Sequence, residues 1–153
     1  MTNLARLLLS PHGRIGRKAF WRGWGLTVLI SLGAWLIPVV GGFISLSTLW
    51  MWAALCAKRL HDLGQSGWAQ LAPLALATAS VLCGVAVMAL GIVVSEQMGA
   101  FFTREAASMG AKGVLLLVLL VGPSVWLVFT LWLGLAKGEA GENRFGPTPD
   151  VRL

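Results

Sequence analysis

Charged side chains are scarce in this sequence. Only 12% of its 153 residues are Asp, Glu, Lys or Arg, whereas soluble proteins carry about 25%. Hydrophobic residues make up 57% of the chain. A soluble domain of this length needs more polar surface than the remaining residues can cover. The scarcity of charge therefore excludes a water-soluble globular domain and indicates that lipid surrounds most of the chain.

Cysteine and histidine are also rare, which argues against several kinds of site. The two cysteines, Cys56 and Cys83, lie in different apolar segments, and helical rise separates them in depth by roughly 20 Å. We therefore expect no disulfide. The two histidines have no spaced carboxylates around them, so we predict no metal site and no cofactor. No nucleophile motif is evident, and no catalytic residue is predicted.

Long stretches without charge are what the sequence has instead. Residues 23–57 and 63–95 contain no charged side chain. The first stretch is much longer than the roughly 20 residues that one spanning helix needs, and its proline and paired glycines at 38–42 predict a turn. We predict one all-α domain, residues 1–153, that forms a four-helix transmembrane bundle of two hairpins. The expected spans are residues 18–40, 43–61, 67–94 and 113–136.

Two further segments are amphipathic rather than uniformly apolar. Residues 96–112 bring four charges and an apolar pattern at helical spacing, which predicts a short interfacial helix on the outer side between the third and fourth spans. The apolar run within residues 1–9 is too short for a cleavable signal peptide. Leu4, Leu7 and Leu8 share one helical face, so we expect this segment to lie in the inner interface.

Lys and Arg are distributed unevenly between the two ends of the predicted spans. The N-terminal segment, the loop between the second and third spans and the C-terminal tail hold ten, and the opposite side holds two. The positive-inside rule then predicts a multi-pass membrane protein with both termini in the cytoplasm. The cations that flank the spans explain the net charge of +6, so we predict no nucleic-acid partner.

Three polar segments fall on the predicted cytoplasmic side. Residues 58–68, KRLHDLGQSGW, have cations suited to a helix end, Gly64 as a left-handed cap and Ser66 as the cap of the next helix. A tight turn explains these features, but not Asp62 beside His61. Residues 13–21, GRIGRKAFW, suit anchoring at headgroup level. Residues 141–149, GENRFGPTP, are typical of a turn-rich tail with an aromatic side chain in the interface.

Taken together, the three segments resemble the bacterial inner-membrane family called domain of unknown function 805. The first family motif, Arg-x-x-Arg-x-x-Phe-Trp, is matched by Arg14, Arg17, Phe20 and Trp21. The second, a loop, is matched by Arg59, Leu60, His61, Asp62, Gly64, Ser66, Gly67 and Trp68. The third is matched by Asn143, Gly146 and Pro149. The resemblance covers residues 10–149 and implies a membrane location and this fold, without an assigned activity.

The chain departs from the family pattern at three positions. Lys58 stands where the family usually has arginine, Ala69 where a second tryptophan is common, and Phe145 where tyrosine is usual. These departures argue against a role that needs a bidentate guanidinium at position 58 or a phenol at position 145.

We predict that the three segments form one polar cluster on the cytoplasmic side. In this cluster Asp62 pairs with one of three arginines, and hydrogen bonds from other members complete it. Its candidate binding residues are Arg14, Arg17, Arg59, His61, Asp62 and Asn143. The cluster either clamps the tail to the helix ends or binds an anionic phospholipid or a protein partner.

Three classes of function follow from this arrangement. A non-catalytic membrane protein is the class that requires the fewest specific roles of these residues. An enzyme that acts on a lipid headgroup through His61 is the alternative, but adjacent helical residues point about 100° apart, so His61 and Asp62 make a poor dyad. A small transporter or channel subunit is the third class, although the ionisable residues expected inside its spans are missing. Small residues at four-residue spacing also permit a homo-oligomer.

Overall fold

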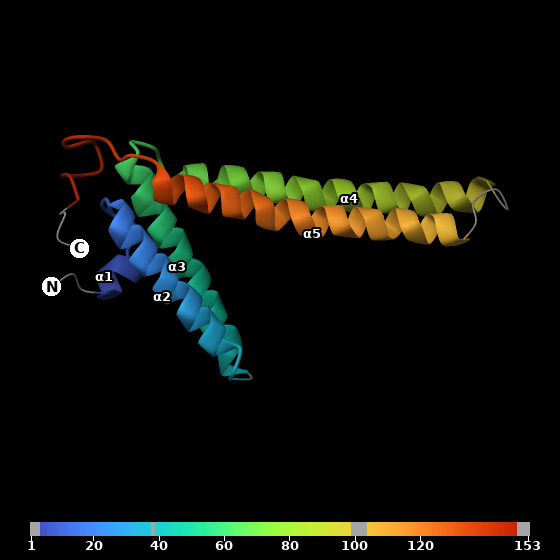
Figure 1. Cartoon of the computed structure of the whole chain (residues 1–153), viewed down its shortest axis with the longest axis horizontal. Coiled ribbons are helices and arrows are strands. Elements are labelled where there is room, and N and C mark those ends of the chain that lie inside the picture. Colours follow the sequence, from blue (N-terminus) through green and yellow to red (C-terminus); the bar gives the residue numbers. More distant parts are fainter. Residues whose placement is uncertain (1–3, 38, 99–103, 150–153) are drawn as a thin grey trace. The chain divides into compact units, whose positions relative to one another are not determined.

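The computed structural model describes residues 4–37, 39–98 and 104–149, and its named elements are all helical. They are α1 Leu4–Leu9, α2 Arg17–Ala34, α3 Val40–Asp62, the 3-10 helix η1 Gly67–Gln70, α4 Leu71–Met98 and α5 Arg104–Leu135 (Figure 1). The predicted all-α class is confirmed. The chain forms two compact units: unit 1 is Met1–Gln70 with Leu131–Leu153, and unit 2 is Leu71–Thr130.

Three segments of the described chain are long and apolar enough to cross a membrane: Val40–Asp62, Gly67–Val94 and Lys112–Leu135. They coincide with the second, third and fourth predicted spans and indicate a multi-pass membrane protein. The first predicted span corresponds to α2, which does not belong to this group because its 18 residues begin with three cations in the first two turns. A fourth crossing therefore stays a prediction.

In unit 1, α2 and α3 pack along each other as an antiparallel hairpin. A side chain at Gly23 would meet Leu55, and one at Gly41 would meet the carbonyl oxygen of Ala34. The two contacts lie toward opposite ends of the hairpin, so small residues let the helices approach along their whole length. α3 begins at Val40, three residues before the predicted start, because Gly41 serves this helix contact rather than the turn.

The core of unit 1 lies where these two helices meet the last turn of α5. Phe20, Leu55 and Leu60 are fully buried, as is Leu133 of α5. Burial of each such side chain contributes about 1.5–3 kcal/mol. This packing brings the polar last turn of α3 close to the start of α2 and to the tail, which we define as residues 136–149.

In unit 2, α4 and the larger part of α5 form a second hairpin. A side chain at Gly84 would meet Val114 and Val118, so α4 and α5 approach closely at this point. Most large apolar side chains of α4 are exposed, as are many of those described in α5. A helix that is apolar on all sides is suited to lipid rather than to water.

The predicted interfacial helix over residues 96–112 is not a separate element. Residues 96–98 end α4, residues 99–103 lie outside the described part, and residues 104–112 are the first turns of α5. Alanine, glutamate, methionine and lysine in this segment favour a helix. Helical hydrogen bonding therefore runs without interruption from the polar start of α5 into its apolar part.

Candidate functional site

Arg59, in the last turn of α3, is the centre of the polar cluster. It is fully buried, and a buried guanidinium needs partners for its N–H groups. Its Nε donates to the carbonyl oxygen of Leu133 at 2.8 Å and one terminal nitrogen donates to that of Ile15 at 3.3 Å. The other terminal nitrogen donates to the carbonyl oxygen of Ala136. Arg59 therefore ties the end of α5 to α3 and to the segment before α2.

Asp62 is the carboxylate that two arginines share. Residues three apart on a helix are neighbours, and one carboxylate oxygen accepts a bond from Arg59. The other oxygen accepts two bonds from Arg14, from Nε at 3.2 Å and from a terminal nitrogen at 3.1 Å. Asp62 is only 3% exposed. Both oxygens are thus occupied by charge-assisted hydrogen bonds within the protein.

Arg14 extends the network into the tail. Its terminal nitrogens donate to the carbonyl oxygens of Glu139 at 2.8 Å, Gly141 at 2.7 Å and Gly146 at 3.2 Å. The backbone N–H of Glu139 in turn donates to the carbonyl oxygen of Asp62 at 2.8 Å. We call Arg14, Arg59 and Asp62 with these tail carbonyls the clamp. It holds residues from three distant parts of the sequence in one place.

His61 and Asn143 lie next to the clamp but do not hydrogen-bond to Asp62. The His61 Nδ1–H donates to the carbonyl oxygen of Gly13 at 3.1 Å, a role that follows because a carbonyl oxygen can only accept. The Asn143 amide donates to the carbonyl oxygen of His61 at 3.0 Å and to the Glu139 carboxylate at 2.8 Å. His61 is therefore fixed by backbone contacts and does not form an acid–base dyad with Asp62.

Phe145 packs inside the cluster, whereas the sequence predicted that this side chain dips into the interface. Its ring stacks on His61, with ring centres 4.1 Å apart and planes 10° from parallel. The Arg144 guanidinium lies over the Phe145 ring, with its central carbon 4.7 Å from the ring centre. Such contacts with aromatic rings contribute about 0.5–1.5 kcal/mol each.

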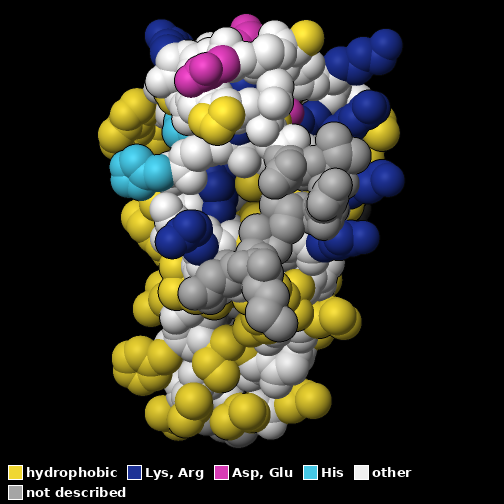
Figure 2. All heavy atoms as spheres, turned by 90° about the vertical axis from the view of Figure 1, so that its left-hand side faces the viewer, with side chains coloured by type: hydrophobic (Ala, Val, Ile, Leu, Met, Phe, Trp, Pro, Cys, Tyr) yellow, Lys and Arg dark blue, Asp and Glu magenta, His cyan; other side chains and the backbone are white. Residues whose placement is uncertain are grey.

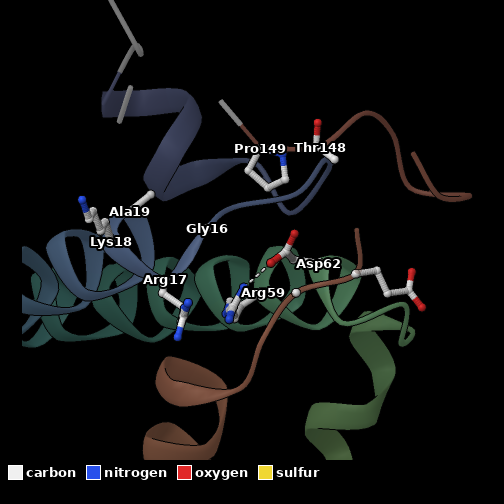
Figure 3. Close-up of a pocket in the computed structure, with 10 residues that line it drawn as sticks. Gly16, Arg17, Lys18, Ala19, Arg59, Asp62, Thr148 and Pro149 are labelled. Atoms are coloured by element: carbon white, nitrogen blue, oxygen red, sulfur yellow. Dashed lines mark hydrogen bonds and ion pairs between the residues drawn. The ribbon is translucent and has the colours of Figure 1, made fainter. Parts of the chain in front are cut away.

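Arg17 is the predicted arginine that the clamp does not use. Its side chain is exposed, and no carboxylate of the described residues lies within ion-pair distance of it. Arg17 instead lines a cavity of about 350 Å³ at the start of α2 (Figure 3). The lining residues are Gly16, Arg17, Lys18, Ala19, Arg59, Asp62, Gly138, Glu139, Thr148 and Pro149.

Two polar contacts of this unit were not predicted as part of the cluster. Lys58 is 3% exposed, and its ammonium group donates to the carbonyl oxygens of Arg6, at 3.0 Å, and Leu7. It therefore holds α1 through the unpaired carbonyls of a short helix. Glu139 joins the cluster through its backbone N–H and through Asn143. No local pattern marks Glu139, because only the path of the tail brings it to α3.

The turn after α3 has the geometry that its residues predict. Gly64 has a φ of +72°, which favours glycine. The Ser66 carbonyl oxygen accepts a bond from the N–H of Ala69 at 2.9 Å and so begins η1. Within the described residues, no group of three or more His, Cys, Asp or Glu side chains could hold a metal ion. The charged side chains of the described site are its arginines and lysine and two carboxylates, those of Asp62 and Glu139.

Comparison with known proteins gives a family but no activity. The family described as "Protein of unknown function (DUF805)" matches residues 8–147. The uncharacterized protein YiiR of Escherichia coli K12, and its counterpart in strain O157:H7, are each 46% identical over 72 residues. The match covers 42% of this chain and 49% of each relative, so the chain spans about half the length of the curated relatives it matches. No solved structure gives a significant match.

The family match extends over most of the chain and includes all the clamp side chains, from Arg14 to Asp62, and the tail as far as residue 147. The polar cluster and the helices that carry it thus lie within the region that defines the family. The chain belongs to the DUF805 family of proteins of unknown function.

Proposed function

We propose that this chain is a non-catalytic, four-span protein of the bacterial inner membrane whose cytoplasmic end binds the headgroups of anionic phospholipids. The main support for this proposal is an excess of exposed positive charge in unit 1. Among its described residues, the exposed cations are Arg6, Arg17, Lys18, Arg22, Lys137 and Arg144, and the exposed carboxylates are Glu139 and Glu142. Each cation near an anionic membrane surface contributes about 1 kcal/mol of attraction.

The position of these cations supports a lipid partner. Figure 2 shows the Lys and Arg side chains in the upper part of the visible face, with acidic and hydrophobic side chains beside them, and hydrophobic side chains without Lys or Arg in the lower part. In sequence, Trp21 and Trp24 stand on either side of Arg22 near the start of α2, and indoles favour headgroup level. The basic surface and the apolar surface thus adjoin, as a headgroup and its acyl chains do.

The fourth crossing is supported by the packing of α2 on α3. α3 is a candidate span, and the Gly23 and Gly41 contacts keep α2 beside it over most of its length. The 18 residues of α2 are about 27 Å long, close to the roughly 30 Å of bilayer hydrocarbon. Four crossings with ten inner and two outer cations then follow the positive-inside rule, with both termini in the cytoplasm.

The contacts of His61 do not favour the enzyme alternative. The imidazole is stacked on Phe145 and bonded to the backbone of Gly13, and the neighbouring Asp62 carboxylate is fully used by arginines. A general acid or base needs access to a reacting proton. A structural role for His61 within the polar cluster is the simpler interpretation.

Lipid analysis of the purified protein tests the lipid-binding function. We expect phosphatidylglycerol and cardiolipin to be enriched over phosphatidylethanolamine, relative to the whole membrane, in protein purified in mild detergent. The inner double variant Arg22→Gln with Lys137→Gln should reduce this enrichment. The matched outer double variant Arg104→Gln with Lys112→Gln should leave it unchanged. Wild-type protein that carries lipids in membrane proportions, or that carries a stoichiometric protein instead, would contradict the proposal.

Reporter fusions test the orientation independently. A reporter that is active only in the cytoplasm should be active when fused after Leu153 and inactive when inserted within residues 98–109. Cytoplasmic activity at the second position would exclude the four-span arrangement.

A further inference from the structure

A cavity at the start of α2 lies open beside the clamp. Arg17 and Lys18 line it from α2, Arg59 and Asp62 from α3, and Thr148 from the tail (Figure 3). Its volume is about 350 Å³, which corresponds to the liquid volume of about ten waters at roughly 30 Å³ each. This space accommodates a phosphate group together with the first atoms of its ester substituents.

The charges around this cavity do not balance. Four cationic side chains, those of Arg14, Arg17, Lys18 and Arg59, adjoin or line it, against the carboxylates of Asp62 and Glu139. The Asp62 carboxylate is occupied by Arg14 and Arg59. Two positive charges therefore remain without an internal counter-charge in the described part of the chain.

The Glu139 carboxylate is turned to other partners. It accepts a bond from the Asn143 amide at 2.8 Å, and a side chain at Gly64 would collide with it. It therefore lies against the turn after α3. Arg17 and Lys18 have no carboxylate partner within residues 4–149 as far as these are described.

We infer, on the basis of the proposed function, that this cavity binds the phosphate of one anionic lipid headgroup, with Arg17 and Lys18 as its charged ligands. A guanidinium can bind two phosphate oxygens at once, and an ammonium adds a point charge. The Thr148 hydroxyl adds a neutral donor. Gly16 precedes α2 without a side-chain cap, so the first N–H groups of α2 supplement these ligands.

The place of the cavity along α2 favours a lipid over a free phosphate. Trp21 lies four residues after Arg17, which is about 6 Å along a helix. Its indole N–H donates to the carbonyl oxygen of Gly134 at 3.3 Å, and the ring is only partly buried. An indole so placed suits the headgroup layer. A lipid whose acyl chains lie beside α2 could then reach the cavity with its phosphate.

Native mass spectrometry of the full chain in mild detergent tests this site. With phosphatidylglycerol added, we expect one tightly retained lipid per chain, and none with phosphatidylcholine. Arg17→Gln with Lys18→Gln should weaken retention by at least about tenfold, since both substitutions remove charge-assisted hydrogen bonds to the phosphate. The matched control is the outer double variant Arg104→Gln with Lys112→Gln, which also removes two positive charges and should keep the lipid.

The outcomes separate this site from the broader proposal. If the Arg17 and Lys18 double variant and the inner double variant Arg22→Gln with Lys137→Gln lose the lipid equally, attraction is diffuse and the cavity site is wrong, while the proposed function stands. If the wild type retains no anionic lipid, both fail. Displacement of the lipid by millimolar glycerol 3-phosphate would assign the phosphate site to a soluble ligand.

A second variant covers the case in which the double variant does not fold. Arg17→Lys keeps the positive charge and removes the planar fork. A built phosphate site predicts weaker retention with an unchanged melting temperature in detergent. Retention equal to that of the wild type in this variant would overturn the role of the Arg17 guanidinium.

Discussion

Asp62→Asn is the most informative change to the clamp, because it removes one charge and almost no volume. The Asp62 side chain accepts three hydrogen bonds, two from Arg14 and one from Arg59. Arg59 is fully buried, so water cannot replace the lost counter-charge. The substitution therefore leaves a buried cation without its partner.

The expected cost is large. Removal of one partner of a buried ion pair destabilises a protein by about 3–5 kcal/mol. Asparagine keeps one carbonyl acceptor, so we expect the lower end, about 3 kcal/mol, which corresponds to roughly a hundredfold change in an equilibrium. The lost stability should appear mainly as weaker attachment of the tail to α3, because Arg14 and Arg59 donate hydrogen bonds to carbonyl oxygens of the tail.

Amide hydrogen exchange of the protein in lipid nanodiscs measures this loss. The reporters are two backbone N–H groups of the tail. That of Glu139 donates to the carbonyl oxygen of Asp62 at 2.8 Å, and that of Gly146 donates to the carbonyl oxygen of Asn143 at 2.9 Å. We expect their exchange to accelerate by about two orders of magnitude, or to the unprotected rate if that is reached first.

Two controls make the experiment decisive. Glu142→Gln removes an exposed tail carboxylate and should change exchange by less than about twofold, because surface charges contribute little. Arg14→Gln combined with Asp62→Asn should cost less than the sum of the single changes, because the residues share their bonds. Unchanged exchange in Asp62→Asn would refute the clamp.

Three further changes test neighbouring contacts. Gly138→Ala places a methyl group against the clamp carboxylate and should accelerate the same amide exchange by tenfold or more, at a cost of about 1–3 kcal/mol. Lys58→Met removes the ammonium bound to the carbonyls of α1, so trypsin should cleave after Arg6 faster, by a factor that reflects about 1–3 kcal/mol. Phe145→Ala removes the stack on His61, costs about 0.5–1.5 kcal/mol, and should shift the imidazole signals in NMR spectra.

Each of these changes has a matched control. Gly25→Ala adds a methyl group where no atom lies within 4 Å, apart from chain neighbours and the nearby backbone of α2. Amide exchange in the tail should therefore stay as in the wild type. Lys58→Arg keeps a cation that can reach the α1 carbonyls, and Phe145→Tyr keeps the ring. If Lys58→Arg speeds cleavage as much as Lys58→Met, the contact of the Lys58 ammonium with α1 is contradicted. If Phe145→Tyr shifts the imidazole signals as much as Phe145→Ala, the stack on His61 is contradicted.

Local sequence signals predicted most helices but not all their ends. The ends of the predicted second and fourth spans, residues 61 and 136, lie within one residue of the observed ends Asp62 and Leu135. The start of α5 differs by nine residues, because a segment with four charges and good helix formers looks amphipathic by itself and also continues a helix. Composition cannot distinguish these two outcomes.

The cluster shows a similar division between what was predictable and what was not. The motifs named Arg14, Asp62 and Asn143 as neighbours in space, because three segments fall on one predicted side of the membrane. The part of Glu139 was not predictable, since its contact with α3 arises from the backbone path of the tail. Stacking of Phe145 on His61 was missed for the same reason.

The sequence by itself determined that this is a helical chain for a membrane, because apolar run length and low charge depend only on local composition. Only the tertiary structure decided which arginine serves which purpose. Arg14 and Arg17 are three residues apart and chemically identical, yet Arg14 binds Asp62 and the tail while Arg17 faces a cavity. The partners of Arg14 come from residue 62 and residues 139–146, and only helix packing brings their oxygen atoms within hydrogen-bond distance of Arg14 and not of Arg17.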